Sequence, residues 1–261
     1  MVLFQSELRR GRVPLLLWSA GISIMLGLCI LIYPEMRSQM GDISTMFADM
    51  GKFTEAFGMD QLNFGEFKGY FGIECSNVLG IGGALYAALL GINALSKEEK
   101  DHTAEFLLSH PISRNRIYGE KLLAVVVQII CMNLMIALVT IGATCAIEET
   151  LPRKEGSLLL LSFLLLQLEI GGLTFGLSAF LRGNSPGIGL GLALLMYFMN
   201  LVSNLIENGN VLKYFTPFSY ADSAQIFTQG NVPGEYILSG FALTSIVLMT
   251  GWRNYRNKDI R

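Results

Sequence analysis

Long stretches without charged residues dominate this sequence, and they restrict its fold more than any other feature. A helix that crosses the hydrocarbon core of a membrane needs about 20 consecutive, mainly apolar residues. Six blocks of this kind follow one another, at about 15–33, 71–95, 122–147, 157–181, 187–206 and 236–252. A segment in lipid must satisfy its backbone hydrogen bonds internally, so each block is predicted to be a helix. The predicted fold class is an all-α integral membrane protein, a single transmembrane domain (1–261) with six transmembrane helices.

The composition agrees with a membrane protein and argues against two other classes. Only 15% of the residues are charged, whereas soluble domains average about 25%. The net charge of -2 gives no reason to expect a nucleic acid as a partner. The four cysteines lie in or beside apolar blocks, in a spacing that predicts neither a zinc site nor a disulfide framework. They are expected to be small buried residues.

The basic residues predict how the chain is oriented in the membrane. With the N-terminus placed inside, most of the 19 basic residues fall on inner segments, as the positive-inside rule requires. An even number of spans returns the basic C-terminal tail to the same side. Both termini are therefore predicted to be cytoplasmic.

Two segments outside the spans have an amphipathic pattern. Residues 4–12 predict a short interfacial helix on the inner surface before the first span. In the extracellular segment 35–70, large apolar residues recur at helical spacing; they are Met36, Met40, Ile43, Phe47 and Met50. This second helix either lies on the membrane surface or over the outer mouth of the protein, or packs between the outer loops and the ends of the spans.

The inner segment 96–121, between the second and third spans, has the most informative pattern. Charged residues come first, and Leu107 and Leu108 then follow on one helix face. Pro111 forces a break, and Ser113 is well placed to cap a new helix. The pattern predicts a short amphipathic helix at the cytoplasmic surface. Such a helix either docks in a groove of a soluble partner or lies on the surface without a partner.

This inner segment resembles the coupling region of ABC transporter permeases of the exporter type-2 family, which have the type V exporter fold. In that family, acidic residues precede a Gly-Thr-x-Glu-x-Leu-Leu-x-x-Pro-x-Ser-Arg stretch and a later lysine. The matching residues here are Glu99, Thr103, Glu105, Leu107, Leu108, Pro111, Ser113, Arg114 and Lys121. His102 replaces the usual glycine, which changes the expected geometry of the turn at that point.

Weaker similarities to the same family extend to most of the chain. The stretch 7–12 followed by Leu17-Trp18-Ser19 is similar to the start of the family's first span. The tail, with Lys258-Asp259-Ile260, and the outer segment 216–220 also resemble corresponding family segments.

The resemblance implies one half of an exporter. A second permease, identical or paralogous, would complete the membrane part, and a pair of cytoplasmic ABC ATPases would dock on the coupling regions. It also implies a bacterial plasma membrane. The sequence contains no Gly-x-x-x-x-Gly-Lys-Ser/Thr phosphate loop, so ATP and Mg²⁺ are expected on the partner, with no catalytic residue, metal or cofactor on this chain. The cargo stays open among a hydrophobic compound, a peptide, a lipid-like molecule and an ion.

Three polar residues inside the predicted spans are candidates for the translocation path. Glu169 lies near the middle of the fourth span, where a charge costs about 3 kcal/mol or more. It would bind a cation, a proton or cargo, or join helices through a polar neighbour such as Gln128, Asn133 or Gln167. Asn200 and Asn204 lie one turn apart on the fifth span and either join helices or contact cargo.

Three other functions compete with this hypothesis. Glu148, Glu149 and Arg153 match the Glu-Glu-x-x-x-Arg motif of intramembrane CAAX-type proteases. Those enzymes need metal-binding histidines within the spans, yet His102 and His110 lie in the inner loop, on the opposite side. A secondary transporter or channel, the main alternative, usually has more spans or inverted repeats. A polysaccharide flippase shares the six spans, but its typical N-terminal region is not evident.

Overall fold

The computed structural model describes residues 2–37, 54, 62–63, 65–100, 113–181, 183, 185–206 and 209–257, the side chains of 2 and 98–100 excepted. These residues form helices and connecting turns, with no strand among them. The long helices are α1 (Val2–Arg37), α5 (Gly82–Lys100), α7 (Arg114–Ala146), α8 (Arg153–Ser178), α9 (Pro186–Leu205) and α12 (Gly234–Asn257). The short ones are α4 (Phe67–Cys75), the π-helix η1 (Ser76–Ile81), α10 (Asn210–Lys213), the 3-10 helix η2 (Pro217–Ser219) and α11 (Ser223–Gln229).

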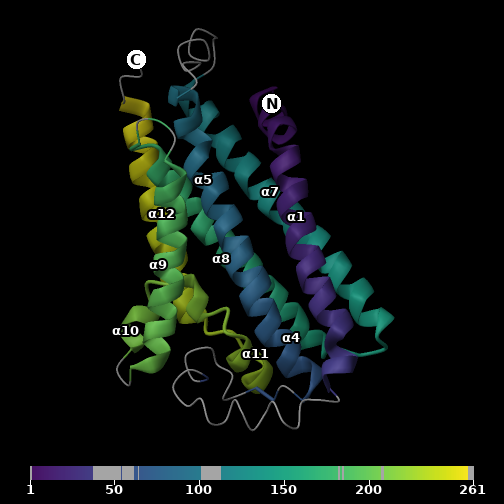
Figure 1. Ribbon diagram of the computed structural model, residues 1–261. Helices are drawn as coiled ribbons and strands as arrows, with labels where there is room; N and C mark the ends of the chain where they lie inside the picture. Colours follow the sequence, from purple (N-terminus) through teal and green to yellow (C-terminus); the bar gives the residue numbers. More distant parts are fainter. Residues whose placement is uncertain are drawn as a thin grey trace.

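Six of these helical stretches are long and apolar enough to cross a membrane, as the sequence predicted. The second stretch is composite, because α4, η1 and α5 continue directly into one another. The start of α1 and the end of α12 lie at the same end of the molecule (Figure 1). We call this the terminal end. The end of α5 and the start of α7 also lie there, whereas α10 and α11 lie at the opposite end.

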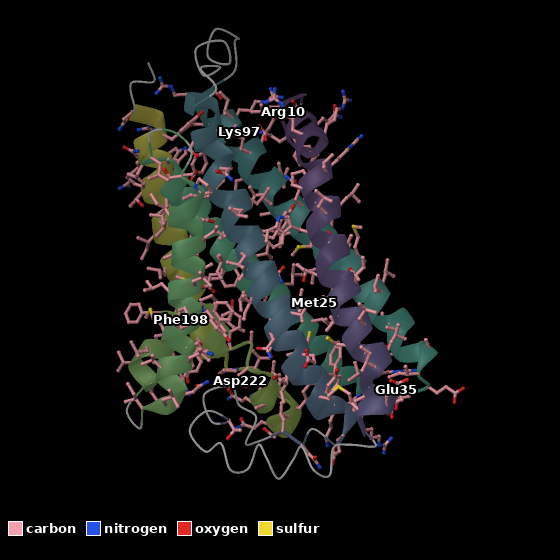
Figure 2. The ribbon with its side chains drawn as sticks, viewed as in Figure 1. Arg10, Met25, Glu35, Lys97, Phe198 and Asp222 are labelled. Atoms are coloured by element: carbon pink, nitrogen blue, oxygen red, sulfur yellow. The ribbon has the colours of Figure 1, made fainter. Side chains whose placement is uncertain are left out.

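Helix α8 is the centre of the bundle. It packs against α5 on one side, α12 on another and α7 on a third, while α1 runs along α7 and α9 along α5. Of the most apolar stretch of α8, 67% is buried inside the protein, against 22% for α9 and 17% for α12. The exposed apolar side chains of the outer helices, such as Leu138, Phe198 and Leu238, therefore form the surface expected to face lipid. Phe198 points away from the bundle (Figure 2).

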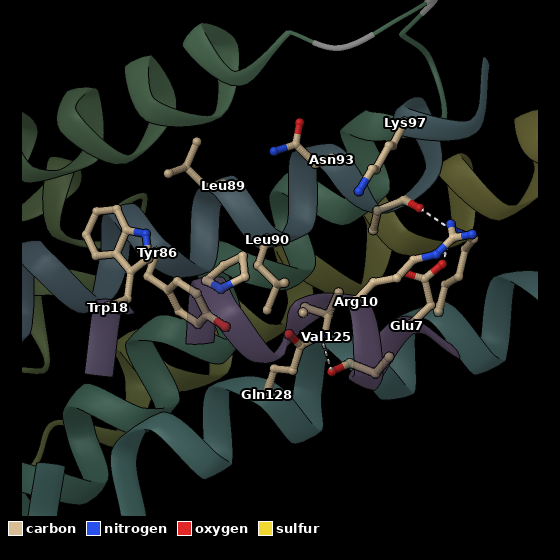
Figure 3. A pocket seen from close by; sticks show the side chains of 15 residues that line it. Glu7, Arg10, Trp18, Tyr86, Leu89, Leu90, Asn93, Lys97, Val125 and Gln128 are labelled. Atoms are coloured by element: carbon tan, nitrogen blue, oxygen red, sulfur yellow. Dashed lines mark hydrogen bonds and ion pairs between the residues drawn. The ribbon is translucent and has the colours of Figure 1, made fainter. Parts of the chain in front are cut away.

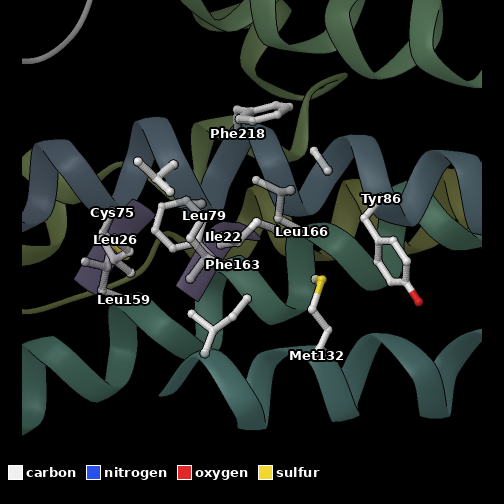
Figure 4. Packing of buried hydrophobic residues seen from close by; sticks show 14 of the residues in the cluster. Ile22, Leu26, Cys75, Leu79, Tyr86, Met132, Leu159, Phe163, Leu166 and Phe218 are labelled. Atoms are coloured by element: carbon white, nitrogen blue, oxygen red, sulfur yellow. The ribbon is translucent and has the colours of Figure 1, made fainter. Parts of the chain in front are cut away.

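The core lies where α8 meets η1, α5 and α7. Leu79, Met132, Phe163 and Leu166 are almost completely buried there and interdigitate (Figure 4). Because lipid is as apolar as these side chains, association of the helices depends on close packing rather than on escape from water. Gly91 shows how close it is: a Cβ at this position would overlap Thr174 Oγ1 and the Gly171 carbonyl of α8.

Two expectations about helix ends differ from the structure. Residues 4–12 are the first turns of α1 rather than a separate interfacial helix. The first span was predicted to end near residue 33, but α1 passes Pro34 and continues to Arg37. Proline lacks only one backbone donor and keeps a helical φ, and helices in membranes tolerate that loss when neighbours satisfy the carbonyl. Most of the amphipathic outer segment predicted within 35–70 lies outside the described residues.

Candidate functional site

The start of α7 is where the predicted coupling region enters the described part of the chain. Thr103, Glu105, Leu107, Leu108 and Pro111 lie outside the described residues, and Glu99 is described only by its backbone at the end of α5. Ser113 is the N-cap residue of α7, as predicted, and its hydroxyl accepts from the Arg116 N–H at 3.4 Å. This bond satisfies one of the free donors at the helix start.

Arg114 connects the start of α7 to the end of α12. Its Nη1 donates to the backbone carbonyl of Tyr255 at 3.3 Å and to that of Arg256 at 3.0 Å. These carbonyls belong to the last turns of α12, where the helix dipole favours a cation. A residue identified through the family resemblance thus links two helices far apart in sequence.

Lys121 joins three helices. Its side chain is 2% exposed, and its Nζ donates to Glu7 Oε1 of α1 at 2.9 Å and to the Ala94 carbonyl of α5 at 2.7 Å. A buried ammonium is tolerated only when it is paired and hydrogen-bonded, and both conditions are met here. Lys121 therefore holds α1 and α5 against α7.

Glu120, on the next position of α7, holds the beginning of α1. One carboxylate oxygen accepts from the Phe4 backbone N–H at 3.0 Å, and the other from Arg116 Nε at 2.8 Å. An anion at this place satisfies a free N–H group at a helix start and complements its dipole. We call Glu7, Arg114, Arg116, Glu120 and Lys121, with the backbone groups that they contact, the terminal belt.

Glu169, the acid predicted near the middle of the membrane, is 1% exposed. The hydroxyl of Tyr220, just after η2, donates to Glu169 Oε2 at 2.9 Å. Burial raises the pKa of the Tyr220 hydroxyl, and the carboxylate raises it further, so this hydroxyl stays protonated and donates. On the other side, a Cβ at Gly240 of α12 would overlap both carboxylate oxygens. Glu169 therefore joins α8 to η2 and α12.

Glu169 joins helices through a polar neighbour, which is one of the roles considered for it, but this neighbour is Tyr220, and the three residues named as examples are engaged elsewhere. Asn133 donates from Nδ2 to Gln167 Oε1, and Gln167 donates from Nε2 to the Leu79 carbonyl. Gln128 donates to the Ala124 carbonyl of its own helix. Tyr220 is the partner instead, because the turn after η2 folds back onto α8. Helical spacing in the sequence does not reveal this contact.

Asn200 and Asn204 of α9 line a small cavity next to the π-helix. The cavity has a volume of about 50 Å³, and Ser76, Asn77 and Asp222 also line it. Drug-sized ligands occupy pockets of about 300–1,000 Å³, so this cavity in its present form suits water or an ion. π-Helices often lie at functional sites, and this cavity brings both predicted residues of the fifth span beside one.

The protease-like motif lies at the opposite end. Glu149 forms an ion pair with Arg37, with Oε1 3.2 Å from Nη1, and Glu148 is exposed. Among the residues that the structure describes, no group of three His, Cys, Asp or Glu side chains is placed to hold a metal. The two histidines lie outside the described residues.

Comparison with known families shows the family to which the chain belongs. The model of one family, described as ABC-2 family transporter protein, matches residues 1–259. The chain belongs to the ABC-2 transporter family. The resemblance seen in the inner segment is therefore confirmed, and the permease is the membrane component of a transporter, for which the family implies an associated ABC ATPase. No match to a curated protein was found.

Several permease residues in these contacts were not among the predicted site residues. Glu120 precedes Lys121 in the sequence, and Glu7 forms an ion pair with Lys121 in the structure. Both could have been suspected from the sequence, because they are charged residues near the start of a spanning helix. Tyr220 lies in the segment noted for its family resemblance, but nothing in the sequence pairs it with Glu169. The backbone acceptors of Arg114 and Lys121 cannot be read from any sequence pattern.

Proposed function

We propose that this permease is the membrane subunit of an ATP-driven exporter in a bacterial plasma membrane. It works with a second permease, identical or paralogous, and is energised by a pair of separate cytoplasmic ABC ATPases that hold ATP and Mg²⁺. The cargo is a hydrophobic compound, a peptide, a lipid-like molecule or an ion. Family membership and the absence of a phosphate loop from the sequence support this division of labour.

The terminal belt is the observation that carries the proposal. The segment predicted to dock the ATPase leads directly into α7, and in its first turns α7 is tied to α1 and α5 by Lys121 and to α12 by Arg114. A displacement of the coupling segment is therefore passed to four helices at once. Rigid elements connected in this way can carry coupling between distant sites.

The charge of the terminal end supports a cytoplasmic location for it. The basic residues described there are Arg9, Arg10, Arg12, Lys97, Arg114, Arg116, Lys121, Arg253 and Arg256. Basic residues next to spans favour the cytoplasmic side. In a background without the native cysteines, Arg12→Cys should react with a membrane-impermeant maleimide only after the cells are opened, whereas Asn231→Cys should react in intact cells. The reverse pattern would contradict this orientation.

Docking of the ATPase is tested by reversing one charge in the predicted coupling region. Glu105→Arg should abolish co-purification with the ATPase while leaving the permease inserted in the membrane, because it places a cation where the family pattern has an acid. Glu148→Arg, an exposed acid at the opposite end, is the matched control and should co-purify normally. Co-purification that survives Glu105→Arg would overturn the docking assignment.

Within this proposal, the three intramembrane polar residues have different roles. Asn200 and Asn204 line a cavity and are the candidates for contact with cargo. Glu169 is enclosed between Tyr220 and Gly240 and acts first as a joint between helices. A secondary transporter or channel, the alternative function, would operate without any ATPase.

A further inference from the structure

A cavity of about 340 Å³ lies at the terminal end between α1, α5 and α7. Trp18, Tyr86 and Leu90 form its apolar walls, and polar side chains from all three helices also face it (Figure 3). Its volume is in the range of ligand pockets, about 300–1,000 Å³. It is separate from the polar cavity beside η1 and from the Glu169 joint.

Three buried polar atoms in this cavity have no partner among the described residues. They are the Tyr86 hydroxyl, Asn93 Oδ1 and Gln128 Oε1. Tyr86 is 2% exposed and Gln128 3%. A buried polar group without a hydrogen bond raises the free energy of the folded protein. Asn93 and Gln128 line the cavity, so a small rotation of either amide would present its oxygen to a donor on a bound ligand.

The mouth of the cavity is positively charged. Glu7 and Lys121 also line it, but they neutralise each other. Arg10 of α1 and Lys97 of α5 remain, and neither forms an ion pair with another described residue. Their side chains lie at the same end of the molecule, on the two helices that flank the cavity (Figure 2). Two such cations favour an anionic group between them.

Toward the middle of the membrane, the space between α1 and α5 continues as an apolar cavity of about 470 Å³. Ile22, Met25 and Val78 line it. Trp18 lines both cavities, and its ring packs against that of Tyr86 with the centroids 6.0 Å apart. The two cavities together form a groove that is basic at the terminal end, polar below that, and apolar at depth.

We propose that this α1–α5 groove binds one anionic glycerophospholipid with hydroxyl groups in its head, of the phosphatidylglycerol class, from the leaflet at the terminal end. The phosphate lies between Arg10 and Lys97, the headgroup hydroxyls donate to Asn93 and Gln128, and an acyl chain covers Ile22 and Met25. In such a lipid the hydroxyls lie on the water side of the phosphate, so the head group folds back into the cavity of about 340 Å³ while an acyl chain enters the apolar one.

A helix of a second copy fits the groove less well. Its backbone N–H groups would already be used within the helix, and the outward faces of the described helices expose apolar side chains such as Leu138, Phe198 and Leu238 rather than donors. It would also leave Arg10 and Lys97 without an anion. The lipid site does not depend on the proposed ATPase docking, and the failure of either proposal would leave the other standing.

Fluorescence quenching of Trp18 tests the site. The chain has two tryptophans, so Trp252→Phe leaves Trp18 as the single emitter. In phosphatidylcholine vesicles of the full-length protein, a small fraction of brominated phosphatidylglycerol should quench Trp18 well above the level for random mixing. Because basic residues near a membrane surface attract anionic lipids, Arg10→Gln with Lys97→Gln should lower the preference for this lipid at least fivefold.

Two controls make the result specific. Arg9→Gln with Arg12→Gln removes the same charge from exposed positions that do not line the cavity, and should leave the preference unchanged. Brominated phosphatidylmethanol, equally charged but without hydroxyls, should bind more weakly than phosphatidylglycerol, and Gln128→Leu should reduce that difference. An equal loss in both double variants would reduce the effect to surface charge and overturn the site. Trp18 that no brominated lipid quenches would show that protein covers the groove, which also overturns it.

Discussion

The terminal belt and the α1–α5 groove lie next to each other and contain similar polar residues, yet they are built differently. In the belt, every polar side chain has fixed partners: Lys121 contacts Glu7 and Ala94, and Glu120 contacts Phe4 and Arg116. In the groove, buried oxygens of Tyr86, Asn93 and Gln128 have none among the described residues. The two regions share Glu7 and Lys121 and differ in whether the protein completes its own hydrogen bonds.

The difference separates what holds this permease together from what it can bind. A satisfied polar network in a medium of low dielectric constant is rigid and specific, and the belt has this character. An unsatisfied polar network, such as that of the groove, raises the free energy of the empty protein. A ligand that completes the hydrogen bonds stabilises it. The following predictions test this separation, from the largest expected effect to the smallest.

Lys121→Met should have the largest effect, because it removes the residue that joins α1, α5 and α7. It leaves the Glu7 carboxylate without its cation, and breaking a pair of this kind costs about 3 kcal/mol. The measurement is the midpoint of thermal unfolding in detergent. Lys97→Met, an exposed lysine of the groove, should change stability by less than about 0.5 kcal/mol. Equal losses of stability in the two variants would contradict the distinction between the belt and the groove.

Gly240→Ala should destabilise the protein by about 2 kcal/mol, a typical cost of overpacking. Its Cβ would overlap the Glu169 carboxylate, and this buried side chain can move aside only by breaking its hydrogen bond to Tyr220 or by repacking the contact between α8 and α12. The same unfolding measurement applies. Gly191→Ala on α9 meets open space and should be neutral or slightly stabilising, because alanine favours helix. A tolerated Gly240→Ala would mean that Glu169 is free to move and would reopen a role in translocation.

Tyr220→Phe should cost about 1–2 kcal/mol, because it leaves a buried carboxylate oxygen without its donor. Tyr214→Phe is the control, since this tyrosine is 41% exposed. Loss of its hydroxyl should change the free energy of unfolding by less than the experimental error. Stability of both variants is compared by chemical unfolding in the same detergent. No loss for Tyr220→Phe would show that its hydrogen bond does not hold η2 to α8.

Gln128→Leu should have the smallest effect, within about 0.5 kcal/mol in lipid-free detergent, because it removes an acceptor without a partner among the described residues and one long hydrogen bond, at 3.3 Å to the Ala124 carbonyl of its own helix. Gln167→Leu, by contrast, breaks hydrogen bonds to Asn133 and Leu79 and should cost about 1–2 kcal/mol. Thermal unfolding of the two variants side by side gives the comparison. A large loss for Gln128→Leu would place it among the structural residues.

The sequence predicts the membrane fold well, because apolar length is a local property. All six spanning helices are found from runs of residues such as 187–206, and the cap at Ser113 follows from its place before α7. Two features of the helices escaped prediction. The π-helix Ser76–Ile81 leaves no mark on apolar periodicity, and α1 passes Pro34 because membrane helices tolerate this residue.

The sites are harder to predict, because they depend on contacts between distant segments. Lys121 and Arg114 were found only through the family resemblance, and their acceptors are backbone carbonyls of α5 and α12. The partner of Glu169 comes from a turn far along the chain. The groove combines Arg10, Tyr86 and Gln128 from three helices, and each alone has an ordinary position in an amphipathic or apolar stretch.

The ATPase is proposed to dock at the terminal end. Purification of the tagged permease from its native membrane in mild detergent tests this docking most directly. Mass spectrometry then identifies the chains that accompany it and their stoichiometry. We predict a phosphate-loop ATPase in stoichiometric amount, lost in the Glu105→Arg variant, together with either one or two kinds of permease chain. A permease that purifies without any ATPase, even after cross-linking in the membrane, would contradict the exporter function and favour a secondary transporter or channel.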